Sequence, residues 1–179
     1  MIDWTLIPHK HAAIIRNIVG PGLRFGEHLP REPDETLAPD GRPYIYRWHV
    51  IPRRLVGGNV YCHLQVLDDP DRPLHDHPWD NQSVILAGGY IEHYQENPPR
   101  GPRKVRRLRA GDVAQRKAGE AHRLILLGDY SVSLFSTGPV IRKWGFWDGD
   151  RWLDYRELRE TGPGGIDRLK KGAFDEPSM

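Results

Sequence analysis

The chain has 179 residues, which is too short for two full-sized domains. Of these residues 38% are hydrophobic and 28% are charged, a composition that excludes a disordered chain. Its 26 basic and 24 acidic side chains leave a formal net charge of +2, so we expect a small-molecule partner and no nucleic acid. No segment has the roughly 18 apolar residues of a membrane span, which excludes a membrane partner, and the single cysteine, Cys62, cannot form an internal disulfide, which favours a reduced cytoplasm.

The N-terminal part of the chain predicts an arm outside the main domain. Residues 1–20 carry apolar side chains at a weakly helical spacing, which ends at Gly20-Pro21-Gly22. This pattern predicts a short helix or an arm laid against the rest of the protein. Residues 21–43 are rich in proline, glycine and acidic residues and predict an irregular connection. We therefore assign residues 1–43 to an N-terminal arm and connection.

From Tyr44 onward the sequence changes to short β-type runs separated by turn residues. The predicted strands are residues 44–51, 60–67, 83–95, 104–108, 122–127, 131–136 and 140–147. The breaks between them include Gly57-Gly58-Asn59, residues 68–71 and 97–99, Gly111-Asp112 and Gly128-Asp129. Because no long helical segment separates these runs, they predict an all-β sandwich or closed barrel over residues 44–160. Residues 152–160 predict one or two closing helical turns, and residues 161–179 a polar C-terminal tail.

Two histidines near the middle of the chain have the spacing of metal ligands. His75 and His77 are two residues apart, and alternate side chains of an extended strand point to the same face. Both imidazoles can therefore reach one ion. We predict His122 as the third ligand, because the apolar run after it would hold it on a buried strand. Three imidazoles leave coordination positions open, as in catalytic metal sites.

At these residues the sequence resembles the cupin superfamily (RmlC-like jelly rolls). The first cupin motif is Gly, then His-x-His, three or four residues, Glu, six residues and Gly. In this chain His75 and His77 are followed by four residues, then Gln82, six residues and Gly89. The resemblance implies a double-stranded β-helix, a jelly-roll barrel, with the short helix or arm at its N-terminus.

The second cupin motif is Gly, five residues, Pro-x-Gly, two residues, His, three residues and Asn. Its spacing is matched by Gly111, Lys117, Gly119, His122 and Leu126, with Lys117 in place of Pro and Leu126 in place of Asn. The resemblance covers about residues 60–138 and leaves both ends of the chain outside it.

The main departure from the family is Gln82, which stands where a glutamate ligand is usual. Gln82 would be a neutral oxygen ligand or none, so the ion could be held by three histidines alone, as in thiol dioxygenase cupins. Asp80, three residues after His77, is a rival carboxylate ligand. Either Gln82 or Asp80 could supply a fourth ligand.

Two further residues are candidates for catalysis. His63 belongs to an alternating polar set with Tyr61 and Gln65, which could face the barrel cavity or water. Glu92 could act as an acid or base if it is buried near the ion, while an exposed polar stripe is the simpler interpretation. The basic run over residues 100–109 could attract an anion or form a solvated hairpin. Arg142 could clamp a carboxylate or lie at the edge of the core.

The leading interpretation is a metal-dependent cupin enzyme, a dioxygenase-type oxidoreductase that acts on a small organic substrate with one divalent transition metal ion, Fe, Zn, Ni or Mn. One alternative is a non-catalytic cupin that binds or senses a small molecule. Another is a metal-free cupin similar to sugar-nucleotide epimerases, which predicts histidine nitrogens more than about 5 Å apart. The resemblance also implies a homodimer, formed through edge strands or the N-terminal arm.

Overall fold

The computed structural model describes residues 2–22, 28–38, 41–51, 57–69, 73–161 and 167–169. The predicted N-terminal helix is present: a short 3₁₀ helix, η1 (Trp4–Leu6), precedes an α-helix, α1 (His9–Val19). The helix packs Ala12 and the fully buried Ile15 against the sheet. No helix in this described part of the chain has both the length and the hydropathy of a transmembrane span.

Strands form the remaining regular structure of these residues. Their bounds are β1 (Glu35–Leu37), β2 (Ile45–His49), β3 (Asn59–Gln65), β4 (Leu74–His75), β5 (Asn81–Gln95), β6 (Lys104–Arg109), β7 (Val113–Arg116), β8 (Ala121–Thr137), β9 (Gly145–Asp148), β10 (Arg151–Asp154), β11 (Arg159–Thr161) and β12 (Asp167–Leu169).

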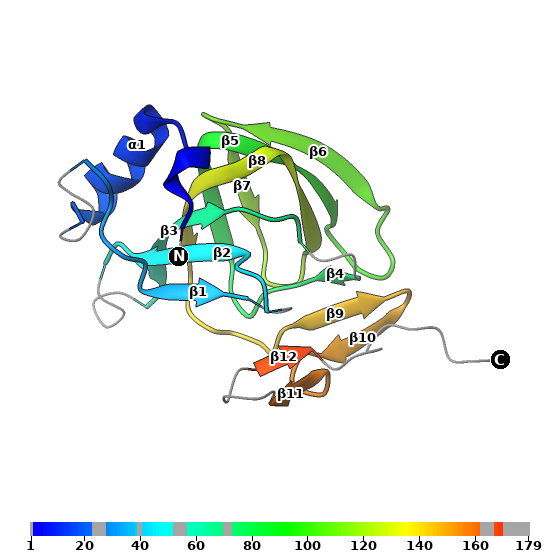
Figure 1. Ribbon diagram of the computed structural model, residues 1–179. Coiled ribbons are helices and arrows are strands. Elements are labelled where there is room, and N and C mark those ends of the chain that lie inside the picture. The colour runs from blue at the N-terminus through cyan, green and yellow to red at the C-terminus, as the bar shows by residue number, and fades with distance from the viewer. Residues whose placement is uncertain are drawn as a thin grey trace.

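Ten strands form one antiparallel sheet that curls around an interior (Figure 1). The hydrogen-bonded order is β1-β2-β3-β8-β4-β9-β10, and the long strand β5 pairs with β6, β7 and β8. Strands β5 and β8 pair along most of their length, from Asn81 opposite Thr137 to Gln95 opposite Ala121. Strands β11 and β12 form a separate hairpin. The predicted all-β jelly roll is therefore correct.

Two glycines allow β5 to bend where the sheet curls. Gly88 has a φ of +66° and Gly89 a φ of +154°, and the register between β5 and β8 shifts directly after the pair Gly88–Ser131. A Cβ atom at Gly88 would lie 2.2 Å from the carbonyl oxygen of Tyr130. A residue with a side chain does not fit there, so glycine is required for this β-bulge.

The alternation of β3 separates an apolar face of the sheet from a polar one. Cys62 and Leu64 are fully buried in the core that α1 covers. Tyr61, His63 and Gln65 point to the opposite face and are also buried, so this polar face is turned to the interior and not to water. The buried residues of the core under α1 are Ile2, Ile7, Ala12, Ile15, Tyr46, Trp48, Cys62, Leu64, Ala87 and Val132.

The Cys62 thiol in this core should be almost inert in the native protein. Its exposed fraction is 0%, and burial raises its pKa to about 12. Because the thiolate is the reactive form, we expect iodoacetamide at about pH 8 to alkylate the native protein at least ~100-fold more slowly than the urea-unfolded chain. Mass spectrometry of both time courses measures the rates. Similar rates would mean that the interface between α1 and β3 opens readily.

The predicted helical turns over residues 152–160 are wrong. Strand β10 forms a hairpin with β9 in which Trp152 lies opposite Trp147, and a turn follows at residues 155–158. The indole of Trp152 donates a hydrogen bond to Asp76, 2.9 Å away. This contact spans 76 positions of the chain, so the local pattern could not reveal it.

The predicted break at Gly128-Asp129 is also wrong. Residues 122–127 and 131–136 belong to the single strand β8. Residues 127–130 have no partner across the ladders described for β8, and Gly128 and Asp129 are exposed. The turn-forming residues are therefore accommodated as a bulge opposite the glycine bend of β5.

Short strands account for the other differences. Strands β1 and β7 were not predicted, and β1 lies within the stretch expected to be irregular. The strand predicted over residues 140–147 starts only at Gly145, because the preceding loop is held at Pro78, whose carbonyl accepts from the Ile141 amide at 2.8 Å. Of the predicted tail, residues 167–169 form β12, and residues 162–166 and 170–179 lie outside the described residues.

Candidate metal centre

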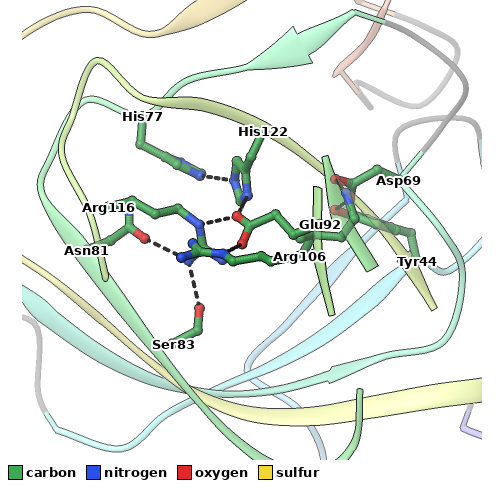
Figure 2. Close-up of polar contacts among 10 residues, drawn as sticks. Tyr44, Asp69, His77, Asn81, Ser83, Glu92, Arg106, Arg116 and His122 are labelled. Atoms are coloured by element: carbon green, nitrogen blue, oxygen red, sulfur yellow. Dashed lines mark hydrogen bonds and ion pairs between the residues drawn. The ribbon is translucent and has the colours of Figure 1, made fainter. Parts of the chain in front are cut away.

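The three predicted histidines meet in the interior of the curled sheet. The ligand nitrogens of His75, His77 and His122 all lie within 4.8 Å of one another, and Nε2 of His77 is 2.9 Å from Nε2 of His122 (Figure 2). Metal–imidazole bonds of about 2.1 Å place two nitrogens on one ion about 3.0 Å apart at a right angle and about 3.4 Å apart at a tetrahedral angle. The 2.9 Å separation of His77 and His122 and the set of three imidazole donors therefore fit one shared divalent ion.

Cross-strand pairing brings the second-motif histidine to the His-x-His pair. Strand β4 has only two residues and lies between β8 and β9, so that His75 faces His122 on one side and Phe146 on the other. His77 is the second residue after the end of β4, and its ring centroid lies 5.2 Å from that of His75. The cluster therefore depends on the register of three strands that are distant in the sequence.

Burial favours the neutral, metal-binding form of His77. Burial, followed by the charges of His122 and Arg116, holds the pKa of His77 well below its ordinary value. A neutral imidazole keeps the lone pair that binds a metal ion.

Glu92 is fully buried and lies directly behind His122 (Figure 2). Its Oε1 accepts a hydrogen bond from Nδ1 of His122 at 2.8 Å. An ionised carboxylate can only accept, so Nδ1 carries the proton and Nε2 of His122 is free to bind a metal. The interpretation of Glu92 as part of a solvent-facing stripe is therefore wrong.

Two arginines keep Glu92 ionised. Nε of Arg116 donates to Oε1 at 2.5 Å, and Nε of Arg106 donates to Oε2 at 2.6 Å. Burial alone would raise the pKa of Glu92, but the hydrogen bond from His122 and the charge of Arg116 hold it well below its ordinary value. Arg116 has only 2% of its side chain exposed, so the ion pair is shielded from solvent.

Neither predicted fourth ligand points to the histidine cluster. Gln82 faces away from the interior, and its Oε1 accepts a hydrogen bond from Gln115 at 2.9 Å. Asp80 uses one carboxylate oxygen to accept from the Ala118 amide at 3.0 Å and the other to pair with Lys117 at 2.8 Å. Both side chains therefore have partners on the rim of the sheet.

The inward-facing residue at this point is Asn81. Its Oδ1 accepts from Arg116 at 3.3 Å, and Ser83, two residues further along β5, accepts from the same guanidinium at 3.2 Å. Nδ2 of Asn81 is buried without a hydrogen-bond partner among the described residues.

The first cupin motif, which the sequence resembles, allows either three or four residues between its second histidine and the next ligand position. With three residues after His77, that position is Asn81, and the glycine of the motif is Gly88. The alternation of buried residues along β5 decides in favour of this register.

His63 lies on the interior wall. Its Nε2 accepts from Nε of Arg47 at 3.0 Å, and burial, with the nearby charge of Arg47, holds its pKa well below the ordinary value. Its ring stacks on Phe135 with centroids 5.2 Å apart, and the Phe135 centroid is 6.1 Å from that of His77. An aromatic wall therefore connects His63 to the histidine cluster.

The basic residues divide between the interior and the surface. Arg106 points inward to Glu92, whereas Arg107 and Arg109 alternate to the exposed face of β6. Arg142 donates to the buried carboxylate of Asp76 at 2.7 Å, which places it in the protein framework and not at an open pocket mouth.

A cavity of about 470 Å³ opens beside the histidine cluster, which does not line it. Arg116 and Asn81 belong both to its lining and to the network behind His122. The lining residues are Asp80, Asn81, Gln82, Gln115, Arg116, Lys117, Glu120, Ser136, Thr137 and Gly138.

Comparisons with known proteins found similarity only among solved structures. No protein-family model and no curated protein sequence matches the chain. The Fe(II) form of HppE in complex with substrate is 13% identical, with a TM-score of 0.48, over 59% of this chain and 56% of that one. DMSP lyase DddQ from Ruegeria pomeroyi DSS-3 is 18% identical, with a TM-score of 0.47, over 66% and 59%. A cupin-like protein from Thermotoga maritima MSB8 is 16% identical, with a TM-score of 0.41, over 62% and 76%.

The curled sheet and the histidine cluster are parts of one arrangement. A curled antiparallel sheet surrounds an interior in which the His-x-His pair meets the histidine of the second motif across one strand pair. The chain therefore has a cupin-type jelly-roll fold, with a three-histidine cluster in its interior.

Proposed function

We propose that the protein is a metal-dependent cupin enzyme that holds one divalent transition metal ion on His75, His77 and His122 and acts on a small organic substrate. The observation that carries this proposal is the convergence of the three imidazoles within 4.8 Å of one another. A bound ion would supply Lewis-acid or redox chemistry at the positions that three protein ligands leave open. Oxygenase activity is the leading reaction type, and the ion is Fe, Zn, Ni or Mn.

The residues around the cluster support a prearranged site. Glu92 fixes the tautomer and the direction of the His122 ring, and Arg106 and Arg116 fix Glu92 in turn. Glu92 is held ionised by these contacts, so we assign it to positioning His122 and not to transferring protons. His63 already accepts a hydrogen bond through Nε2, which favours a role in lining the substrate site over general base catalysis.

The aromatic residues of the interior wall favour a small organic substrate. Tyr61, His63 and Phe135 form a stacked series with centroid distances of 5.6 Å and 5.2 Å, and this series leads to His77. Flat aromatic faces bury apolar parts of a ligand, while Arg47 and His63 present polar groups at the same wall. We propose that substrate binds against this wall.

Metal analysis combined with turnover tests this proposal. We expect the purified protein to contain about one transition metal ion per chain by mass spectrometry, and to consume oxygen with one member of a panel of thiols, diketones and small acids. Metal and tight ligand binding without any turnover would favour the non-catalytic sensing cupin. Failure to contain or to bind Fe(II), Zn(II), Ni(II) or Mn(II) would exclude the proposal.

The metal-free alternative, similar to sugar-nucleotide epimerases, has less support. It predicts histidine nitrogens more than about 5 Å apart, whereas the three lie within 4.8 Å.

We further propose that residues 44–160 work as one domain and that the protein acts as a cytoplasmic homodimer. Strands β1 and β10 stand at the two ends of the sheet order formed by the described residues, and such end strands offer surfaces for pairing. Light scattering measures the mass of the protein in solution.

A further inference from the structure

We infer that the β9–β10 hairpin is a working part of the metal centre, because Asp76 locks the two histidines beside it onto that hairpin. Asp76 is then a positioning residue for His75 and His77. The inference rests on the proposed metal site. It also extends the site to residues 142–154, which lie beyond the part of the sequence that resembles cupins.

Asp76 is fully buried and surrounded by donors from the hairpin and the residues before it. Its Oδ1 accepts from the Gly145 amide at 2.7 Å. Its Oδ2 accepts from Nη1 of Arg142 at 2.7 Å, from the indole of Trp152 at 2.9 Å and, more weakly, from the indole of Trp147 at 3.3 Å. Four donors converge on one carboxylate, so its position is fixed on the hairpin side.

The histidines on either side of Asp76 depend on this anchor. Successive side chains of an extended segment point to opposite faces, so Asp76 points away from the face that carries His75 and His77. Strand β4 ends at His75 after only two residues, so few ladder hydrogen bonds hold this segment. The Asp76 amide adds one more, to the Gly145 carbonyl at 3.0 Å. A shift of Asp76 would therefore move both imidazoles.

Arg142 connects the hairpin side to both histidine motifs. The Nη1 that binds Asp76 also donates to the Ala118 carbonyl at 2.9 Å. The same carbonyl accepts from the His77 amide at 3.2 Å, and Ala118 lies in the turn that leads to His122. One guanidinium thus holds the His-x-His segment against the segment that delivers the third histidine.

The first experiment compares Asp76→Asn with Asp154→Asn, using Co(II) as the probe. Asparagine keeps the shape of Asp76 but turns an amide donor toward Arg142 and the indoles, which should displace the segment. We expect Co(II) to bind about 10- to 100-fold more weakly, with a changed visible absorption spectrum. Asp154 is a matched control, since it is buried in β10 and pairs with Lys143 at 3.3 Å without reaching the histidine segment. Asp154→Asn should keep the affinity and spectrum of the wild type.

A second pair of variants decides the question if Asp76→Asn does not fold. Trp152→Phe removes one hydrogen bond to Asp76, and we expect about 3- to 10-fold weaker Co(II) binding with a native thermal transition. Trp144→Phe is its control, because Trp144 stacks on Tyr155 with centroids 4.3 Å apart and is not among the described donors to the Asp76 carboxylate. It should bind Co(II) as the wild type does.

The outcomes separate this inference from the proposed function. If the wild type binds no Co(II), the metal site itself is refuted. If the wild type binds but Asp76→Asn and Trp152→Phe keep its affinity and spectrum, the site stands and the positioning role of Asp76 is overturned. Equal losses in Asp154→Asn and Trp144→Phe would also overturn it, because the hairpin would then act only through general stability.

Discussion

Replacing His75, His77 or His122 with alanine should reduce bound metal from about one ion per chain to less than about one tenth of that. The three nitrogens lie within 4.8 Å, so each variant removes one of three ligands to the same ion. Two remaining imidazoles bind far more weakly, and the loss should be similar in all three variants. Elemental analysis of proteins purified in parallel measures it.

His49→Ala is the control for this series. His49 is partly buried and lies 3.1 Å from Oε1 of Glu35 on β1, outside the histidine cluster, so metal content should stay at the wild-type level. His93 on β5, also outside the cluster, should behave in the same way. The alanine variants should remain folded, because the core under α1 does not include the three histidines. Full metal retention by His122→Ala would contradict the shared site.

Glu92→Gln should lower the free energy of unfolding by about 3 to 5 kcal/mol, as expected when a buried charge loses its counter-charge. Arg116 and Glu92 have 2% and 0% of their side chains exposed, so the remaining guanidinium cannot be solvated in place of its lost partner. Metal binding should also weaken about 10- to 100-fold, because the amide cannot hold the His122 ring as the carboxylate does. Urea denaturation followed by circular dichroism measures the stability.

Glu96→Gln provides the matched control on the same sheet. Glu96 pairs with Lys104 at 2.8 Å, but both side chains are exposed, so its removal should leave the unfolding midpoint unchanged. If Glu92→Gln and Glu96→Gln unfold at the same denaturant concentration as the wild type, the buried pair does not stabilise the fold in the way its geometry implies.

The sequence by itself determined the class of fold and the three histidines. Turn residues between β-type runs predicted an all-β chain, and most long strands agree with the structure within a few residues, as for residues 83–95 against Asn81–Gln95. The His-x-His spacing, together with the resemblance of the spacing around His122 to the second cupin motif, selected three of the nine histidines. These features are local: the period of a strand and the distance between ligands along the chain carry the information.

The sequence could not resolve features that depend on which strands pair. Gln82 and Asn81 are neighbours, and only the alternation of β5 shows that Asn81 faces the interior. The short strands β1 and β7 have too few residues for a recognisable period. The turn residues Gly128-Asp129 predicted a break in the strand. The neighbouring sequence does not show that they lie in a bulge of β8, because that bulge depends on the pairing of β8 with β5.

Tertiary structure alone decided what surrounds the histidines. Glu92 lies 30 positions before His122, and Asp76 lies 66 positions before Arg142, so neither contact leaves a periodic signal in the sequence. In the sequence Glu92 resembles a surface glutamate and Asp76 a spacer between two ligands. Buried charges are stable only when their partners are placed by the packing of several strands, and that placement is a property of the whole sheet. The sequence therefore named the ligands, and the fold decided which carboxylates orient and anchor them.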